Sequence, residues 1–256
     1  MSSICSTAFV SRLKSNFKSG LLALSLVAPA VGLAKVSYRT SFGKCPARST
    51  GALTLKLVRA FEANQSLISL KRAIVEEKLQ DRHFLSDYKI EYHPLKGLLE
   101  LSFNCPTPIM KAQIYKNNGQ DSYEAILVDT GALVDPTYEV LLRDEHKLTQ
   151  ALPTLALPVG DMEKDVQLQI ARLVRNLKWD FRKYLSELIL DEKKDLTIIL
   201  SIQGHPSSVF MGKGDWEEKV DKLRKVIDHM LASGRLPAVI NMTNAKKVVV
   251  KFSDKT

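Results

Sequence analysis

The sequence predicts an α+β protein: an N-terminal single membrane-spanning helix, a small α/β domain, then a strand-rich antiparallel β domain with two helices. Three observations lead to this fold class. An uncharged segment lies near the N-terminus, a strand–helix–hairpin pattern follows it, and most of the remaining apolar runs alternate with period two. With 256 residues, 45% of them apolar and 25% charged, the composition excludes collagen-like, low-complexity and polytopic membrane proteins.

The net charge of +9 belongs to the N-terminal part of the chain. No acidic residue precedes Glu62, and the nine basic residues before it account for the whole excess, since 28 basic and 28 acidic residues remain. A basic tail in front of a neutral body does not indicate a folded nucleic-acid-binding face.

Residues 19–34 carry no charge and lie between Lys18 and Lys35. As a helix they would span roughly 24 Å, which reaches across a bilayer only with help from the flanking lysines. Three interpretations remain open: an uncleaved signal anchor over 19–36, a secretory signal peptide cleaved after Ala28-Pro-Ala30, and an organelle transit peptide. Basic residues flank both sides, so the charge distribution does not give the orientation.

The small domain is expected at 53–120, after a linker at 37–52 that lacks periodicity. Leu53, Leu55 and Leu57 alternate with polar or smaller residues, which predicts a strand at 53–58 and a folded body that begins there. A helix capped by Asn64 or Ser66 should follow and end near Leu79. The runs 88–93 and 98–103 flank a Pro/Gly turn and predict a hairpin, and 109–115 is a further extended run.

The second domain is expected at 121–256. A hairpin is predicted at 125–134, and Val166, Ile170 and Leu173 mark one face of a helix that begins at Asp161. A strand follows at 196–202. Asp215–Glu218 is typical of a capping box that opens a helix ending at Gly234. Two final strands are expected at 237–242 and 246–252.

No catalytic, metal or cofactor site is predicted from the sequence. The run 126–132 resembles the Asp-Thr-Gly-Ala loop of retroviral-type aspartic proteases, with Asp129 as the catalytic carboxylate of a dimer; the competing interpretation is a β-turn. Gly212-Lys-Gly214 lacks the Walker A spacing and is interpreted as a loop before a helix. The five histidines have no ligand spacing, and the three cysteines are too scattered for a disulfide framework or zinc site.

The order of these features resembles the FtsQ/DivIB family of bacterial cell-division proteins. Residues 92–109 are similar to the end of that family's POTRA domain, and 127–134 to the strand pair that opens its β domain. Leu152-Pro-Thr-Leu155 resembles its "LP.L" element, and 212–252 its C-terminal layout. The chain departs from the family at Ile240–Asn244, which lacks the charged pair and the aromatic residue, and at Asn104–Ile109, which lacks Glu-Arg.

The resemblance implies a non-catalytic, single-pass inner-membrane protein of the divisome with no cofactor. Residues 1–18 would be a cytoplasmic tail, 53–120 a POTRA-like domain and 121–256 a β domain, with the bulk of the chain periplasmic at the division site. The implied partners are proteins of the FtsB and FtsL type; the alternative is a secreted periplasmic scaffold or chaperone. The β-branched last strand predicts an edge for β-augmentation. The candidate partner-binding residues are Asn241, Met242, Thr243, Asn244, Lys247, Val248, Val249, Val250, Lys251 and Phe252.

Overall fold

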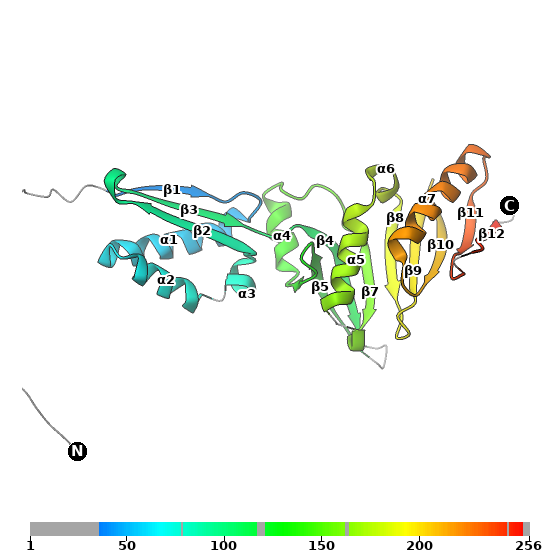
Figure 1. Cartoon of the computed structure of the whole chain (residues 1–256), viewed down its shortest axis with the longest axis horizontal. Coiled ribbons are helices and arrows are strands. Elements are labelled where there is room, and N and C mark those ends of the chain that lie inside the picture. The colour runs from blue at the N-terminus through cyan, green and yellow to red at the C-terminus, as the bar shows by residue number, and fades with distance from the viewer. Residues whose placement is uncertain (1–35, 78, 117–120, 162–163, 245, 253–256) are drawn as a thin grey trace, which may run out of the picture. The chain divides into compact units, whose positions relative to one another are not determined.

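The computed structural model describes residues 36–77, 79–116, 121–161, 164–244 and 246–252. Within these residues the chain forms an α+β fold with two sheets, one of three strands and one of nine (Figure 1). The described residues, which begin at Val36, form one compact unit.

The first domain has the element order β-α-α-α-β-β. Its strands lie in the order β1-β3-β2, with β1 parallel and β2 antiparallel to the central β3. Helices α1 and α2 cover one face of this sheet (Figure 1). The antiparallel pairing of β2 with β3 confirms the predicted hairpin, and the side chain of Ser66 caps α2 as predicted. The elements are β1 Ser37–Ser41, α1 Ala47–Asn64, α2 Leu67–Glu76, α3 Leu79–His83, β2 Asp87–His93, η1 Pro94–Lys96 and β3 Leu98–Asn104.

The predicted strand at 53–58 is wrong, because these residues lie in the middle of α1. Leu53 and Leu57 are four residues apart and both point into the core, a spacing that fits a helix as well as a strand. Leu55, which completed the period-two pattern, is 61% exposed. The expected linker at 37–52 holds β1 and the first turns of α1, so the folded body does not begin at Leu53.

Cys45 and Cys105 form a disulfide, which their separation of 60 residues in the sequence does not predict. The parallel register of β1 with β3 explains the pairing. Ser41 at the end of β1 lies opposite Ser102, so the residues that follow both strands leave the sheet at the same place. Cysteine spacing alone contains no information about this register.

The nine-stranded sheet has the order β12-β11-β10-β9-β8-β7-β4-β5-β6. It is mixed, because β4 and β7, β7 and β8, and β10 and β11 pair in parallel; the predicted antiparallel sheet is therefore wrong. The strands are β4 Pro108–Tyr115, β5 Ser122–Val128, β6 Leu133–Val134, β7 Thr154–Pro158, β8 Leu185–Leu190, β9 Leu196–Ile202, β10 His205–Gly212, β11 Pro237–Asn241 and β12 Val249–Phe252.

Four α-helices accompany this sheet in the described chain, where two were predicted: α4 Thr137–Asp144, α5 Lys164–Asn176, α6 Trp179–Arg182 and α7 Trp216–Ala232; a 3-10 turn, η2, spans Val159–Asp161. Helices α5 and α7 lie over one face of the sheet (Figure 1). Their apolar stripes, including Ile170 and Leu223, belong to one core with β4 and β7 to β11. The sequence missed α4, whose eight residues offer only two turns of pattern.

The predicted fold class also included a membrane-spanning helix, and this part of the prediction is corrected. The predicted span at 19–36 lies outside the described residues except for Val36. Among the helices that the structure does describe, none has the length and apolar content needed to cross a bilayer. The longest, α1, has 18 residues and includes Arg48, Lys56 and Arg59.

The second hydrophobic core is shared between the first domain and the start of the large sheet. Tyr138 and Leu142 of α4 belong to it together with Phe61 and Leu101, and the ring of Tyr138 stacks on that of Phe84. Glu145, just after α4, accepts the N–H groups of Ala47 (2.7 Å) and Arg48 (3.1 Å) and thereby caps α1. A carboxylate at a helix N-terminus satisfies free donors and complements the helix dipole.

Helix α7 does not begin with the predicted capping box. Asp215 has φ +48° and makes no side-chain cap. Instead, the Nζ of Lys219 donates to the carbonyls of Met211 (2.8 Å) and Lys213 (2.9 Å), and the Nε1 of Trp216 donates to Gly212 (2.8 Å). Two side chains from the first turn of the helix thus bind the carbonyl groups of the preceding loop. This confirms the interpretation of Gly212-Lys-Gly214 as a loop before a helix.

A buried carboxylate, Glu77, links the end of α2 to α1 and α3. It is paired with Lys56, and its Oε2 lies 2.9 Å from Nε2 of His83. The hydrogen bonds from Lys56 and then His83 lower the pKa of Glu77 from 4.5 to about 2, against the opposing effect of burial.

We expect Glu77 to make folding stability depend on acid pH. A carboxylate whose pKa is lower in the folded state stabilises the fold above its unfolded pKa, and this contribution disappears as the pH falls from about 4.5 to about 2. Urea midpoints at a series of pH values should show wild type more stable than Glu77→Gln at pH 7, with the difference shrinking below pH 4.5. A pH-independent difference would contradict this assignment.

Candidate partner-binding edge

Strand β12 is the outermost strand of the nine-stranded sheet. It pairs only with β11, antiparallel, with Asn241 opposite Val249 and Ile240 opposite Val250. The outer side of β12 therefore presents backbone groups without a neighbouring strand in the described chain. Such an edge is a template for the addition of another strand.

The pairing of β10 with β11 determines which β12 amides point outward. Met242 N–H donates to Phe210 O (2.8 Å), so this residue directs its backbone polar groups toward β10. Backbone groups alternate along a strand, so those of Ile240 also face β10 and those of Asn241 face β12. Val249, opposite Asn241, therefore points its N–H inward. Val250 and Phe252 point theirs outward.

The side chains on the edge are mostly apolar and accessible. Val248, Val249 and Phe252 are exposed, whereas Val250 packs against the main core. The guanidinium carbon of Arg235 lies 5.5 Å from the ring centre of Phe252, a cation–π contact that orients the ring. Alternation places Val249 and Lys251 on one face of the strand, and Val250 and Phe252 on the face that packs on the core.

The turn that leads into β12 is built by its own asparagines. The Oδ1 of Asn241 accepts the N–H (3.0 Å) and Oγ1 (2.8 Å) of Thr243, and Asn244 Oδ1 accepts the Lys246 N–H (2.9 Å). Met242 is only 2% exposed. Of the predicted site residues, Met242 therefore lies in the core and Asn241, Thr243 and Asn244 shape the turn, while 247–252 carry the accessible edge.

The edge is surrounded by basic side chains. Residues 235–252 include four basic residues and no acidic one: Arg235, Lys246, Lys247 and Lys251. All four lie in the last two strands or the turns beside them. This excess favours a partner segment that carries carboxylates.

The Asp129-Thr-Gly131 sequence forms the turn between β5 and β6, which confirms the β-turn interpretation. Asp129 Oδ1 accepts the N–H of Thr107 (3.0 Å), and Gly131 N–H donates to Val128 O (2.9 Å). Gly131 has φ +77°, and a Cβ there would lie 2.8 Å from Cα of Leu168. Glycine is thus needed to let α5 approach the turn.

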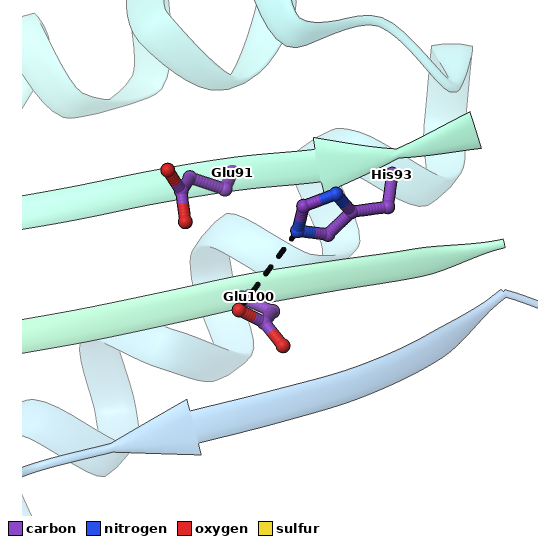
Figure 2. A group of neighbouring side chains, drawn as sticks. All are labelled: Glu91, His93 and Glu100. Carbon is purple, nitrogen blue, oxygen red and sulfur yellow. Dashed lines mark ion pairs between the residues drawn. The ribbon is translucent and has the colours of Figure 1, made fainter. Parts of the chain in front are cut away.

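A cluster of three polar side chains lies on the face of the small sheet that α1 and α2 do not cover. Figure 2 shows Glu91 and His93 on β2 and Glu100 on β3, with possible ligand atoms within 4.8 Å of one another. Hairpin register brings them together: Glu91 lies opposite Glu100. Histidine spacing in the sequence does not predict this cluster, because its members come together only through the pairing of two strands.

The carboxylates of this cluster already have cationic partners. Lys89 Nζ lies 2.8 Å from Glu91, and Arg39 Nη1 lies 2.8 Å from Glu100. The Lys89 hydrogen bond is the main cause of the lowered pKa of Glu91. These contacts offset the repulsion between opposed glutamates, so we assign the cluster no metal ion.

Comparison of the chain with protein-family models and with curated protein sequences finds no match.

Proposed function

We propose that this protein is a non-catalytic scaffold that binds an extended segment of a partner along the outer side of β12. The observation that carries the proposal is the outer side of β12, which has no neighbouring strand among the described residues and presents outward N–H groups at Val250 and Phe252, flanked by exposed apolar side chains and lysines. Main-chain hydrogen bonds would supply affinity, and the basic surroundings would select an acidic segment.

We further propose that the scaffold acts in bacterial cell division in the manner of FtsQ/DivIB proteins, with FtsB- and FtsL-type partners. Two features support this. The first domain has a three-stranded sheet of order β1-β3-β2 covered by two helices, as expected of a POTRA-like domain, and the second ends on an edge strand. Sequence resemblance over 92–109, 127–134 and 212–252 points the same way.

The proposed compartment is the periplasmic side of the inner membrane at the division site. The disulfide between Cys45 and Cys105 supports it, because such bonds persist in oxidising compartments and are rare in the cytosol. A secreted scaffold would meet the same condition. The two are separated by the mature N-terminus, which mass spectrometry would find near Val31 for the secreted form.

A proline on β12 tests the edge, provided that it replaces an outward N–H. Val249 is unsuitable, since its amide faces β11 and proline there would break the sheet. In Val250→Pro, loss of the outward donor should weaken binding to the periplasmic segment of an FtsB-type protein by at least about tenfold. Isothermal titration calorimetry with the purified partner would measure the change.

Val250→Ala is the matched control, because it also removes side-chain packing but keeps the N–H. Its affinity should stay within about threefold of wild type. Circular dichroism must show that both variants are folded. Equal affinities for a folded Val250→Pro protein and its alanine control would place the interface elsewhere.

A further inference from the structure

One end of the first domain carries apolar side chains that pack against little of the protein. Leu95, at the tip of the β2–β3 hairpin, is fully exposed. Ile68, in the first turn of α2, is 74% exposed, and Leu67 beside it is exposed as well. Single exposed apolar residues are common, but several at one end of a domain indicate an interaction surface.

Hydrogen bonds show that the hairpin tip with Leu95 and the α1–α2 turn next to Leu67 and Ile68 lie at the same end of the domain, where β1 begins. Ser37 N–H donates to Gly97 O (2.7 Å), which joins the start of β1 to the hairpin tip. The Oη of Tyr38 donates to Glu62 (2.9 Å), close to the α1–α2 turn. In Figure 1 the start of β1, the tip of the β2–β3 hairpin and the turn between α1 and α2 lie at the same end of the first domain. We call this surface, made of Ser37, 62–68 and 94–97, the entry end.

The chain that leads to the entry end is uncharged over residues 19–34. It joins β1 through Lys35 and Val36 alone. A sixteen-residue stretch without charge prefers an apolar environment. Residues 19–34 therefore favour an apolar environment, as do the apolar side chains exposed on the entry end.

The charges around the entry end are mainly basic. Lys96 lies beside Leu95, and Lys71 and Arg72 follow Ile68 in α2; all three are exposed. The acidic group at this end, Glu62, accepts the Tyr38 hydroxyl. Basic side chains around apolar ones are typical of surfaces that bind anionic lipid headgroups.

We propose that the entry end docks on an anionic lipid surface, with Leu95, Leu67 and Ile68 at the level of the acyl chains and Lys96, Lys71 and Arg72 among the phosphates. This contact is peripheral and uses the folded domain itself. It does not rest on the proposed function, because it uses no residue of the β12 edge.

Hydrogen–deuterium exchange of the full chain tests the proposal. The protein is mixed with phosphatidylcholine vesicles that contain or lack phosphatidylglycerol, so the two samples differ only in the charge of the lipid surface. Exchange in peptides covering 94–98 and 67–70 should slow about tenfold in the anionic vesicles relative to the neutral ones. High salt should reverse this protection, because it screens the basic side chains.

Leu95→Glu should abolish the protection, and Lys96→Glu should lower it about fivefold. Val75→Glu is the matched control: Val75 is 84% exposed but lies at the far end of α2. Its protection should equal that of wild type. Equal exchange in both vesicle types, or equal protection in Leu95→Glu and wild type, would overturn the proposal. Leu95 is exposed, so its substitution tests docking without disturbing the core.

Discussion

Replacing Leu223 by alanine is expected to lower the free energy of unfolding by about 2–5 kcal/mol. Leu223 is fully buried in the middle of α7, where it packs in the core that this helix forms with α5 and the large sheet. Truncation removes buried methyl groups and leaves a cavity that close-packed neighbours fill only in part. Urea unfolding followed by circular dichroism would measure the loss.

Leu55→Ala provides the matched control, because it makes the same chemical change on an exposed site of α1. Leu55 is 61% exposed, so the change in stability should stay within about 0.5 kcal/mol. Similar losses in both variants would mean that α7 does not pack on the sheet as described.

Removal of the disulfide should have an effect of comparable size. A bond that closes a loop of 60 residues restricts the unfolded chain by about 4 kcal/mol in the chain-entropy description. The variant in which both Cys45 and Cys105 are alanine should therefore unfold at a clearly lower urea concentration than the oxidised wild type.

Reduction provides the internal test of this second prediction. Wild type in excess reductant should approach the stability of the double variant, and the double variant should not respond to reductant. Cys5→Ala should leave the oxidised stability unchanged, since Cys45 and Cys105 pair with each other. A wild type that is insensitive to reductant would show that the bond does not form in solution.

Elements with long, regular patterns were predictable from the sequence. The stripe at Val166, Ile170 and Leu173 specified α5, and the Pro/Gly turn between 93 and 98 specified the β2–β3 hairpin. The prediction for α1 was wrong because Leu53 and Leu57, four residues apart, fit a helix as well as a strand; burial of both in the core with the small sheet decides in favour of the helix.

Features that depend on pairing between distant strands were not predictable. The disulfide follows from the parallel register of β1 with β3, and the cluster at Glu91, His93 and Glu100 from that of β2 with β3. The last strand was expected at the chain end, but only the pairing of β10 with β11 identifies Val250 as the residue with an outward N–H. The pattern of apolar residues in a sequence predicts which face of a strand is buried, whereas the strand register determines which residues of other strands lie beside it.

The disulfide also has a mechanical consequence. It joins the residues just after β1 to those just after β3, so a pulling force that enters at Ser37 can pass from Cys45 to Cys105 through the sulfur atoms. The 59 residues between them cannot be drawn out by such a force, which withholds on the order of 200 Å of extended chain. In the oxidised protein, α1, α2 and the β2–β3 hairpin are therefore excluded from the extension of a chain pulled between β1 and the large sheet.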